Sequence, residues 1–212
     1  MILTITGPSG SGKTSLVKIL KKRYGIREIV STTTRAPRKG EKNGIDYNFV
    51  SKEVFRMIPM IESSYFGGNY YGTSESSFLE ALHDDFDSVY VTVVDRNGKE
   101  AFGAYPDVFS VYIQTEPWFA EANLIHRDGK KKAAARIKID AKEGLFSSEG
   151  FDCIIQNDVR TSLDSLAYQF MNFVESRLAI HQFSAAQVPL ASAMGGSAAS
   201  LQSKDIDFQQ NI

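Results

Sequence analysis

Cysteine is almost absent from this chain of 212 residues, whose one thiol is Cys153. A single cysteine cannot form a disulfide within the chain, so a fold stapled by disulfides is excluded. The three histidines and Cys153 show no metal-ligand spacing, and nothing in the sequence predicts a zinc site. Because Cys153 begins a short apolar run, we expect it to be a buried and unreactive thiol.

Long apolar runs and a strong net charge are also missing. No segment has the roughly 20 apolar residues that span a bilayer, and the N-terminus lacks the pattern of a signal peptide. We therefore expect a cytoplasmic protein that does not enter a membrane. The net charge of −1 argues against nucleic acid as a partner. Basic residues cluster at 18–27, 35–42 and 127–138, which suits a small polyanionic ligand.

The length and the apolar pattern predict one α/β domain. Strand-like runs alternate with helical patterns, as in a mostly parallel sheet covered by helices on both faces. We expect strands at residues 2–6, 28–31, 88–95, 108–114 and 153–156. We expect helices at residues 13–24, 97–104, 118–127, 133–146 and 161–178.

Two segments depart from this alternation. Residues 44–72 are rich in Tyr, Phe, Ser and Asn in short runs, which predicts a small β-rich insertion. From residue 181 the composition shifts to Ala, Ser, Gln and Gly, which predicts a flexible C-terminal tail over 181–212. The folded domain would then cover 1–180, with its core at 1–31 and 86–180 and the insertion at about 32–85.

A glycine-rich motif follows the first strand and opens the first helix. It matches the pattern G-x-x-x-x-G-K-[ST] at every fixed position, in the strand and helix context that gives the pattern meaning. Its backbone amides would cradle phosphate at the helix N-terminus, Lys13 would reach the β- and γ-phosphates, and Thr14 would hold Mg²⁺. The candidate triphosphate-binding residues are Gly7, Pro8, Ser9, Gly10, Ser11, Gly12, Lys13 and Thr14.

A second group of motifs points to the other substrate. Thr33-Thr34-Arg35-Ala36-Pro37-Arg38 is followed by Glu41-Lys42-Asn43-Gly44-Ile45-Asp46-Tyr47 and later by Tyr70-Tyr71-Gly72-Thr73. Together with the glycine-rich loop, these motifs resemble the guanylate kinase family over residues 1 to about 178. The resemblance implies a P-loop NTPase-like fold of three layers, a β-rich insertion that binds GMP, and a short helical lid at about 123–136.

The resemblance also implies a role for individual residues. Those that would hold the acceptor phosphate are Arg35, Arg38, Tyr47 and Tyr71, and those that would read guanine are Ser31, Glu62 and Thr73. A carboxylate at position 62 can accept from guanine N1–H and its 2-amino group, whereas adenine has an acceptor at N1. Taken alone, the two tyrosines could equally be core aromatics, Glu62 an exposed acid, and the two arginines a solvated loop.

Further matches lie near the transferring phosphoryl group. The resemblance assigns Arg127 and Arg136, together with Lys13 and Arg35, to neutralising its charge. It places Asp95 near the base of the GMP and the catalytic centre, although Asp95 could instead cap the next helix. Asn157 would lie near the adenine or form a helix-entry turn. The chain departs from the family at Val93, where an aspartate is common, and at Asn123, where an arginine is usual.

The lysines at 130–132 occupy a short connection within the expected lid. They could form a solvated face, belong to a mobile flap, or supply the cation that Asn123 does not.

These matches imply transfer of the ATP γ-phosphoryl group to GMP or dGMP with Mg²⁺. The small-molecule partners would be ATP and GMP or dGMP, and the sequence indicates no oligomeric state. A kinase for another nucleoside monophosphate or for a phosphorylated sugar is one alternative. A non-catalytic module that binds protein partners is another, because Val93 and the unusual lid leave it open.

Overall fold

The computed structural model describes residues 1–84 and 88–186. The chain divides into two compact units, Met1–Val174 and Glu175–Ile212. Helix α7 (Leu163–Ala186) continues past residue 180, so the first six residues of the predicted tail are helical. The remainder of that predicted tail, 187–212, lies outside the described residues.

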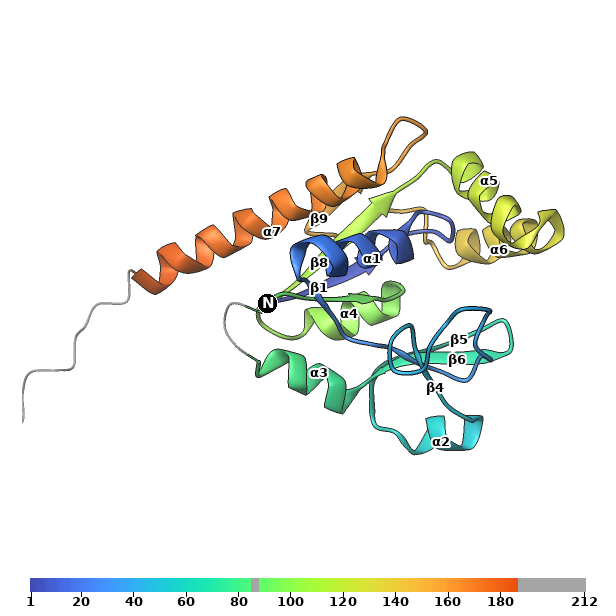
Figure 1. Cartoon of the computed structure of the whole chain (residues 1–212), viewed down its shortest axis with the longest axis horizontal. Coiled ribbons are helices and arrows are strands. Elements are labelled where there is room, and N and C mark those ends of the chain that lie inside the picture. Colours follow the sequence, from blue (N-terminus) through green and yellow to red (C-terminus); the bar gives the residue numbers. More distant parts are fainter. Residues whose placement is uncertain (85–87, 187–212) are drawn as a thin grey trace, which may run out of the picture. The chain divides into compact units, whose positions relative to one another are not determined.

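A five-stranded parallel sheet forms the centre of the first unit (Figure 1). Its order is β2-β7-β1-β8-β9, which confirms the predicted α/β architecture. The strands are β1 (Ile2–Thr6), β2 (Arg27–Glu28), β7 (Tyr90–Val93), β8 (Val108–Gln114) and β9 (Cys153–Gln156). All five residues of β1 are buried, as expected for a central strand covered on both faces.

Two strands are shorter than the sequence predicts. Strand β2 ends at Glu28, although Ile29 N still donates to Val91 O (2.9 Å), and β7 covers only the middle of the apolar run at 88–95. Cys153 is half-buried, not buried as expected, since β9 is an edge strand of the sheet.

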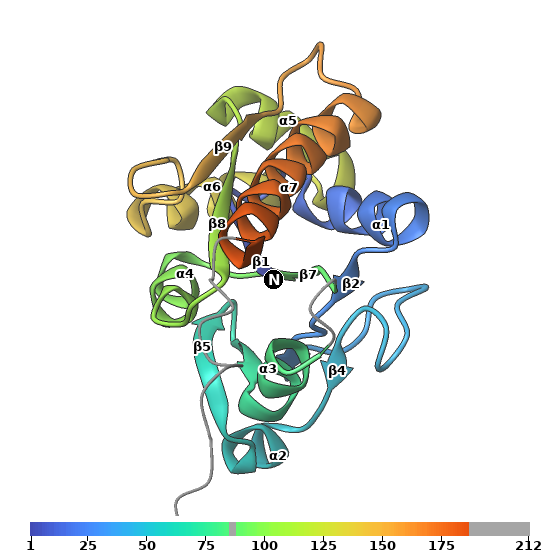
Figure 2. The ribbon, with the colours of Figure 1, turned by 90° about the vertical axis from the view of Figure 1, so that its left-hand side faces the viewer.

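Helices cover both faces of this sheet. Helix α1 (Lys13–Tyr24) and α7 up to Val174 lie on one face, and α4 (Arg96–Gly103) lies on the other (Figure 2). Two more helices, α5 (Pro117–Asp128) and α6 (Lys130–Lys142), form a hairpin joined by Gly129 alone. Within the described parts of the chain, no helix has the length and apolar character needed to cross a membrane.

The insertion contains a second sheet of order β4-β3-β6-β5. These strands are β3 (Thr32–Thr33), β4 (Asn48–Phe49), β5 (Met60–Phe66) and β6 (Asn69–Ser74). The insertion also holds two short helices that the sequence analysis missed, α2 (Lys52–Met57) and α3 (Glu75–Leu82). Each begins after a serine N-cap whose hydroxyl accepts a backbone N–H, Ser51 from Val54 and Ser74 from Ser77.

The insertion shares a hydrophobic cluster with the main sheet. Phe78 of α3 is fully buried, with its ring centroid 5.1 Å from Phe102 of α4 and 4.6 Å from Tyr105. Ile2 of β1 and Val94 after β7 belong to the same cluster. This packing fixes the end of the insertion, at α3, against the main sheet.

Candidate active site

The glycine-rich loop between β1 and α1 has the backbone of a phosphate cradle. Gly7, Gly10 and Gly12 have φ angles of 153°, 86° and 93°, which favour glycine. Lys13 folds back over the loop, and its Nζ donates to the carbonyl oxygens of Gly7 (2.6 Å) and Pro8 (2.9 Å). Ser11 Oγ is buried and has no hydrogen-bond partner within the described chain. A phosphate oxygen bound at the loop would satisfy it.

The ammonium group of Lys13 is poorly solvated. Burial lowers the pKa of Lys13 to about 8, and the nearby Asp140 carboxylate partly offsets this effect. A phosphate placed on the loop would supply the anion that such an ammonium needs.

Two asparagines anchor other elements to this loop. Asn123 of α5 donates from Nδ2 to the carbonyl oxygen of Gly10 (2.9 Å). Asn157, directly after β9, donates from Nδ2 to the carbonyl oxygen of Ser11 (2.8 Å). Asn123 therefore holds α5 against the loop at the position where an arginine is usual in the family.

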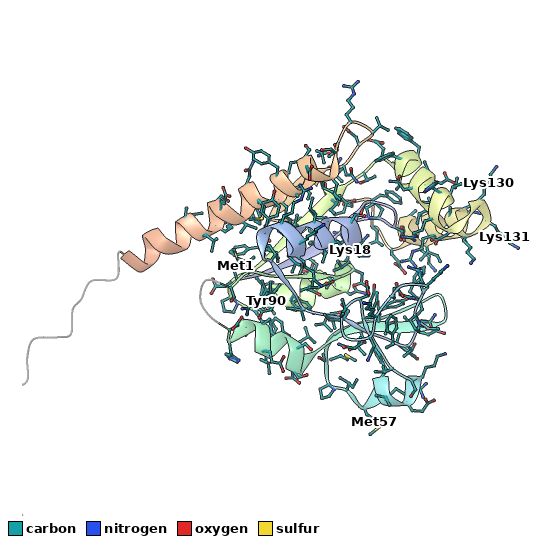
Figure 3. The ribbon with its side chains drawn as sticks, in the orientation of Figure 1. Met1, Lys18, Met57, Tyr90, Lys130 and Lys131 are labelled. Atoms are coloured by element: carbon teal, nitrogen blue, oxygen red, sulfur yellow. The ribbon has the colours of Figure 1, made fainter. Side chains whose placement is uncertain are left out.

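The predicted cations of the α5–α6 hairpin differ in their surroundings. The Arg127 side chain is half exposed, and its Nε and Nη2 donate to Asp128 Oδ2 at 2.9 and 2.6 Å. Lys130 and Lys131 point outward from the hairpin (Figure 3), and residues 130–132 form the first turn of α6, not a flap. Arg136 is the hairpin cation that the structure brings to the glycine-rich loop, donating from Nε to Ser9 Oγ (2.5 Å).

Asp140 is a site residue that the sequence analysis missed. Its carboxylate is completely buried and accepts from the backbone N of Ser9 (2.6 Å) and from Ser9 Oγ (3.1 Å). It also lies 3.6 Å from Arg136 Nε, one helical turn away. The spacing of an arginine and an aspartate four residues apart was the signal available in the sequence.

A cavity of about 400 Å³ opens beside the loop, between α1 and the insertion. Six of the predicted site residues line it: Thr14, Ser31, Tyr47, Glu62, Tyr71 and Asp95. Lys18 of α1, labelled in Figure 3, faces Asp46 of the insertion with 4.0 Å between Nζ and Oδ1. The structure thus brings residues from both sides of the insertion boundary around one space of the size that small ligands occupy.

Glu62 is one of the acids that line this cavity, and its pKa lies near neutral pH. Its carboxylate accepts from Thr73 Oγ1 (3.0 Å), which connects two of the predicted guanine-reading residues. Burial raises the pKa of Glu62 to about 7, the Thr73 hydrogen bond opposes that rise, and the charge of Asp95 adds to it. Asp95 caps α4 by accepting from Gly98 N (2.9 Å), which was the alternative considered for it. It also lines the cavity, while its catalytic role stays a prediction.

Neither of the two predicted phosphate arginines, Arg35 and Arg38, is among the residues that line the cavity. Arg35 forms a two-pronged ion pair with Glu41 (2.9 and 3.0 Å), and its guanidinium lies 5.3 Å from the ring centre of Tyr47. Glu41 accepts from the backbone N of Arg38 as well (2.7 Å), while Arg38 itself is exposed. Glu41 therefore organises this loop, a role that the sequence analysis did not assign to it.

Comparison with known proteins gives a consistent result. The family model described as Guanylate kinase matches residues 1–176. A guanylate kinase of Fusobacterium nucleatum is 30% identical over 172 residues, covering 78% of this chain and 92% of the relative. A guanylate kinase of a Nostoc species is 33% identical over 165 residues, covering 74% and 82%. The crystal structure of guanylate kinase from Anaplasma phagocytophilum shares the fold, with a TM-score of 0.60, 24% identity and coverage of 90% and 96%.

Proposed function

The chain belongs to the guanylate kinase family, and from this premise we propose that it transfers the γ-phosphoryl group of ATP to GMP or dGMP. The observation that carries the proposal is a single cavity lined by Thr14 at the end of the glycine-rich loop and by Glu62 of the insertion. A donor phosphate on the loop and a guanine at Glu62 would therefore share one space. The products would be ADP and GDP or dGDP.

The residues around this cavity would act by position and charge. Phosphoryl transfer needs the two oxygens in line and cations around the transferring group, with little covalent chemistry from the protein. Lys13 and the loop amides would hold the donor phosphates, and Arg136 would face the transferring group from α6. Arg35 would exchange Glu41 for the acceptor phosphate, because a phosphate dianion offers the same two-pronged geometry with more charge.

Glu62 would select the base. Its ionised carboxylate accepts from N1–H and the 2-amino group of guanine, and Thr73 fixes its orientation. Adenine would leave the carboxylate unpaired against an acceptor, which costs about 1–3 kcal/mol.

Mg²⁺ fits this site as a companion of the nucleotide. Within residues 1–84 and 88–186, no three Asp, Glu, His or Cys side chains form a metal-binding group. Thr14 offers a hydroxyl oxygen, the hard ligand that Mg²⁺ accepts beside phosphate oxygens and water. Val93 lines the cavity where an aspartate is common in the family, so Thr14 would be the direct protein ligand. When bound, Mg²⁺ would neutralise charge on the β- and γ-phosphates.

The test is a coupled assay of ADP formation with GMP, dGMP, AMP, UMP and TMP, each with and without Mg²⁺. We expect turnover that requires Mg²⁺ and is greatest with a guanine nucleotide. The proposal fails if AMP, UMP or TMP is phosphorylated and GMP is not, the outcome expected of a kinase for another acceptor.

Substitution of Lys13 by Ala separates an enzyme from a non-catalytic interaction module. We expect Lys13→Ala to abolish phosphoryl transfer, because it removes the ammonium that would pair with the donor phosphates and that now donates to the carbonyl oxygens of Gly7 and Pro8. Lys52→Ala, at an exposed lysine that begins α2, is the matched control and should leave turnover unchanged. A cytoplasmic location and independence from nucleic acid and membranes belong to the same proposal.

A further inference from the structure

Arg136 lies at a junction of three parts of the molecule. It belongs to α6, its Nε donates to Ser9 Oγ of the glycine-rich loop, and its Cζ lies 3.3 Å from the ring centre of Phe66. Phe66 is the last residue of β5, in the insertion that carries Glu62 and Tyr71. One guanidinium is therefore in contact with elements on the donor side and on the acceptor side of the site.

The donor side of this junction is rigid. The buried Asp140 carboxylate accepts twice from Ser9, and Ser9 Oγ in turn accepts from Arg136 Nε. Asp140 and Arg136 are one turn apart on the same helix. These bonds fix one edge of the guanidinium, but they leave its flat face to be held by something else.

Phe66 supplies that contact from the acceptor side. The face of an aromatic ring attracts a cation, most strongly when both are partly removed from water. Phe66 pairs with Asn69 across a two-residue turn, Gly67–Gly68, whose φ angles are 56° and 85°. Two central residues with positive φ are typical of the tight hairpin turn that fixes strand register, so the ring is carried on a well-defined support.

We propose that Phe66 is a positioning residue for the phosphoryl-transfer reaction and acts by holding the guanidinium of Arg136 in place. The inference rests on the proposed function, because it takes Arg136 as the cation beside the transferring group. A cation fixed in advance stabilises developing charge without reorganising during the reaction. Phe66 and Glu62 lie on the same strand, β5. The position of the acceptor side of the site would therefore influence the position of Arg136 through the Phe66 ring.

The first test is substitution of Phe66 by Leu, which keeps an apolar side chain and removes the aromatic face. We expect kcat to fall by roughly 3- to 10-fold, with KM for ATP and for GMP within about twofold of wild type. Phe66→Trp keeps an aromatic face and should restore most of kcat. Tyr65→Leu is the matched control, because that ring packs on Tyr70 at 4.8 Å, and it should leave kcat unchanged.

A double-mutant cycle with Arg136→Ala shows whether Phe66 acts through Arg136. If it does, Phe66→Leu adds no further loss of kcat in the Arg136→Ala background, and the two effects are non-additive. Equal losses in both backgrounds, or a Phe66→Leu enzyme with wild-type kcat, overturn the inference. If the wild-type enzyme phosphorylates GMP and Phe66→Leu has the same kcat, the inference is wrong but the proposed function is still supported.

A second test of the contact between Phe66 and Arg136 does not depend on enzymatic activity. In the NMR spectrum of the 15N-labelled protein, the Arg136 Nε–H signal should be shifted by the ring current of Phe66. We expect Phe66→Leu to remove this shift and Tyr65→Leu to preserve it. An Arg136 signal that is the same in wild type and Phe66→Leu would show that the ring does not hold the guanidinium, whatever substrate the enzyme uses.

Discussion

At the scale of single residues, the site depends on two side chains whose pKa values lie near physiological pH. In the proposed function, Glu62 must be ionised to accept two hydrogen bonds from guanine, whereas burial favours its neutral form. Lys13 must be charged to pair with phosphate, and burial favours the neutral amine there too. Each residue thus needs its ligand in order to adopt its working charge fully.

The first prediction concerns the pH dependence of GMP use. Because the pKa of Glu62 is about 7, we expect kcat/KM for GMP to fall as pH decreases below 7, by up to tenfold per unit. Steady-state rates between pH 5.5 and 8.5 measure this. The GMP phosphate itself titrates at about 6, so Glu62→Gln is the control: its GMP profile should lose the step near 7. If Glu62→Gln keeps the step near pH 7 in kcat/KM for GMP, that step does not come from Glu62.

The second prediction concerns ATP at alkaline pH. The pKa of Lys13 is about 8, so we expect kcat/KM for ATP to decrease as pH rises through that value. The Asp140 carboxylate raises the pKa of Lys13, and Asp140→Asn should therefore move this decrease to lower pH. Glu100→Gln, at an exposed acid on α4, should leave the profile in place. A shift toward higher pH in Asp140→Asn would contradict the assignment.

At the scale of elements, the glycine-rich loop is fixed by its contact with α5 as well as by its own backbone. A Cβ added to Gly10 would lie 2.3 Å from the carbonyl oxygen of Ala120, and the φ of Gly10 is 86°. Gly25 has a similar φ of 68° at the end of α1, but a Cβ there would meet no atom within 4 Å. The two positions separate crowding against α5 from backbone strain alone.

The third prediction compares Ala at these two positions. Gly25→Ala should lower the free energy of unfolding by about 1–2 kcal/mol, the cost of a left-handed backbone for alanine, and retain kcat/KM. Gly10→Ala should also push the loop away from α5 and lower kcat/KM for ATP at least tenfold. Chemical denaturation and steady-state kinetics measure both effects. Equal kinetic losses in the two variants would show that α5 does not support the loop.

The elements that the sequence predicts best are those with a strong local pattern. Helix α1 and strands β1, β8 and β9 have the predicted bounds, because their apolar runs end at glycine or polar residues. Helix α2 was missed because its six residues give too little periodicity to detect. The position of Asp140 against Ser9 joins residues 131 apart in the chain, which no local pattern could indicate.

At the scale of the whole molecule, the site reduces the stability of the fold that carries it. A carboxyl whose pKa is raised on folding stabilises the protein below its unfolded pKa, and this contribution is lost as pH rises through the folded pKa. For Glu62 those values are 4.5 and about 7, so its ionisation lowers the free energy of unfolding by up to about 3 kcal/mol above pH 7. In the proposed function, this loss of stability is the cost of an acidic side chain that recognises guanine.

The fourth prediction follows from this loss of stability. At pH 8 and without ligand, we expect Glu62→Gln to unfold at a higher temperature than wild type, because the amide keeps the neutral form that burial favours. The difference should shrink as pH falls toward 4.5, where the wild-type carboxyl is protonated. Thermal unfolding followed by circular dichroism at pH 5, 6.5 and 8 measures it, with Glu80→Gln on the exposed side of α3 as the control that should change little. If the Glu62→Gln variant is less stable than wild type at pH 8, then interactions of the ionised Glu62 carboxylate outweigh the cost of its burial. The decrease of kcat/KM for GMP below pH 7 would then have another source.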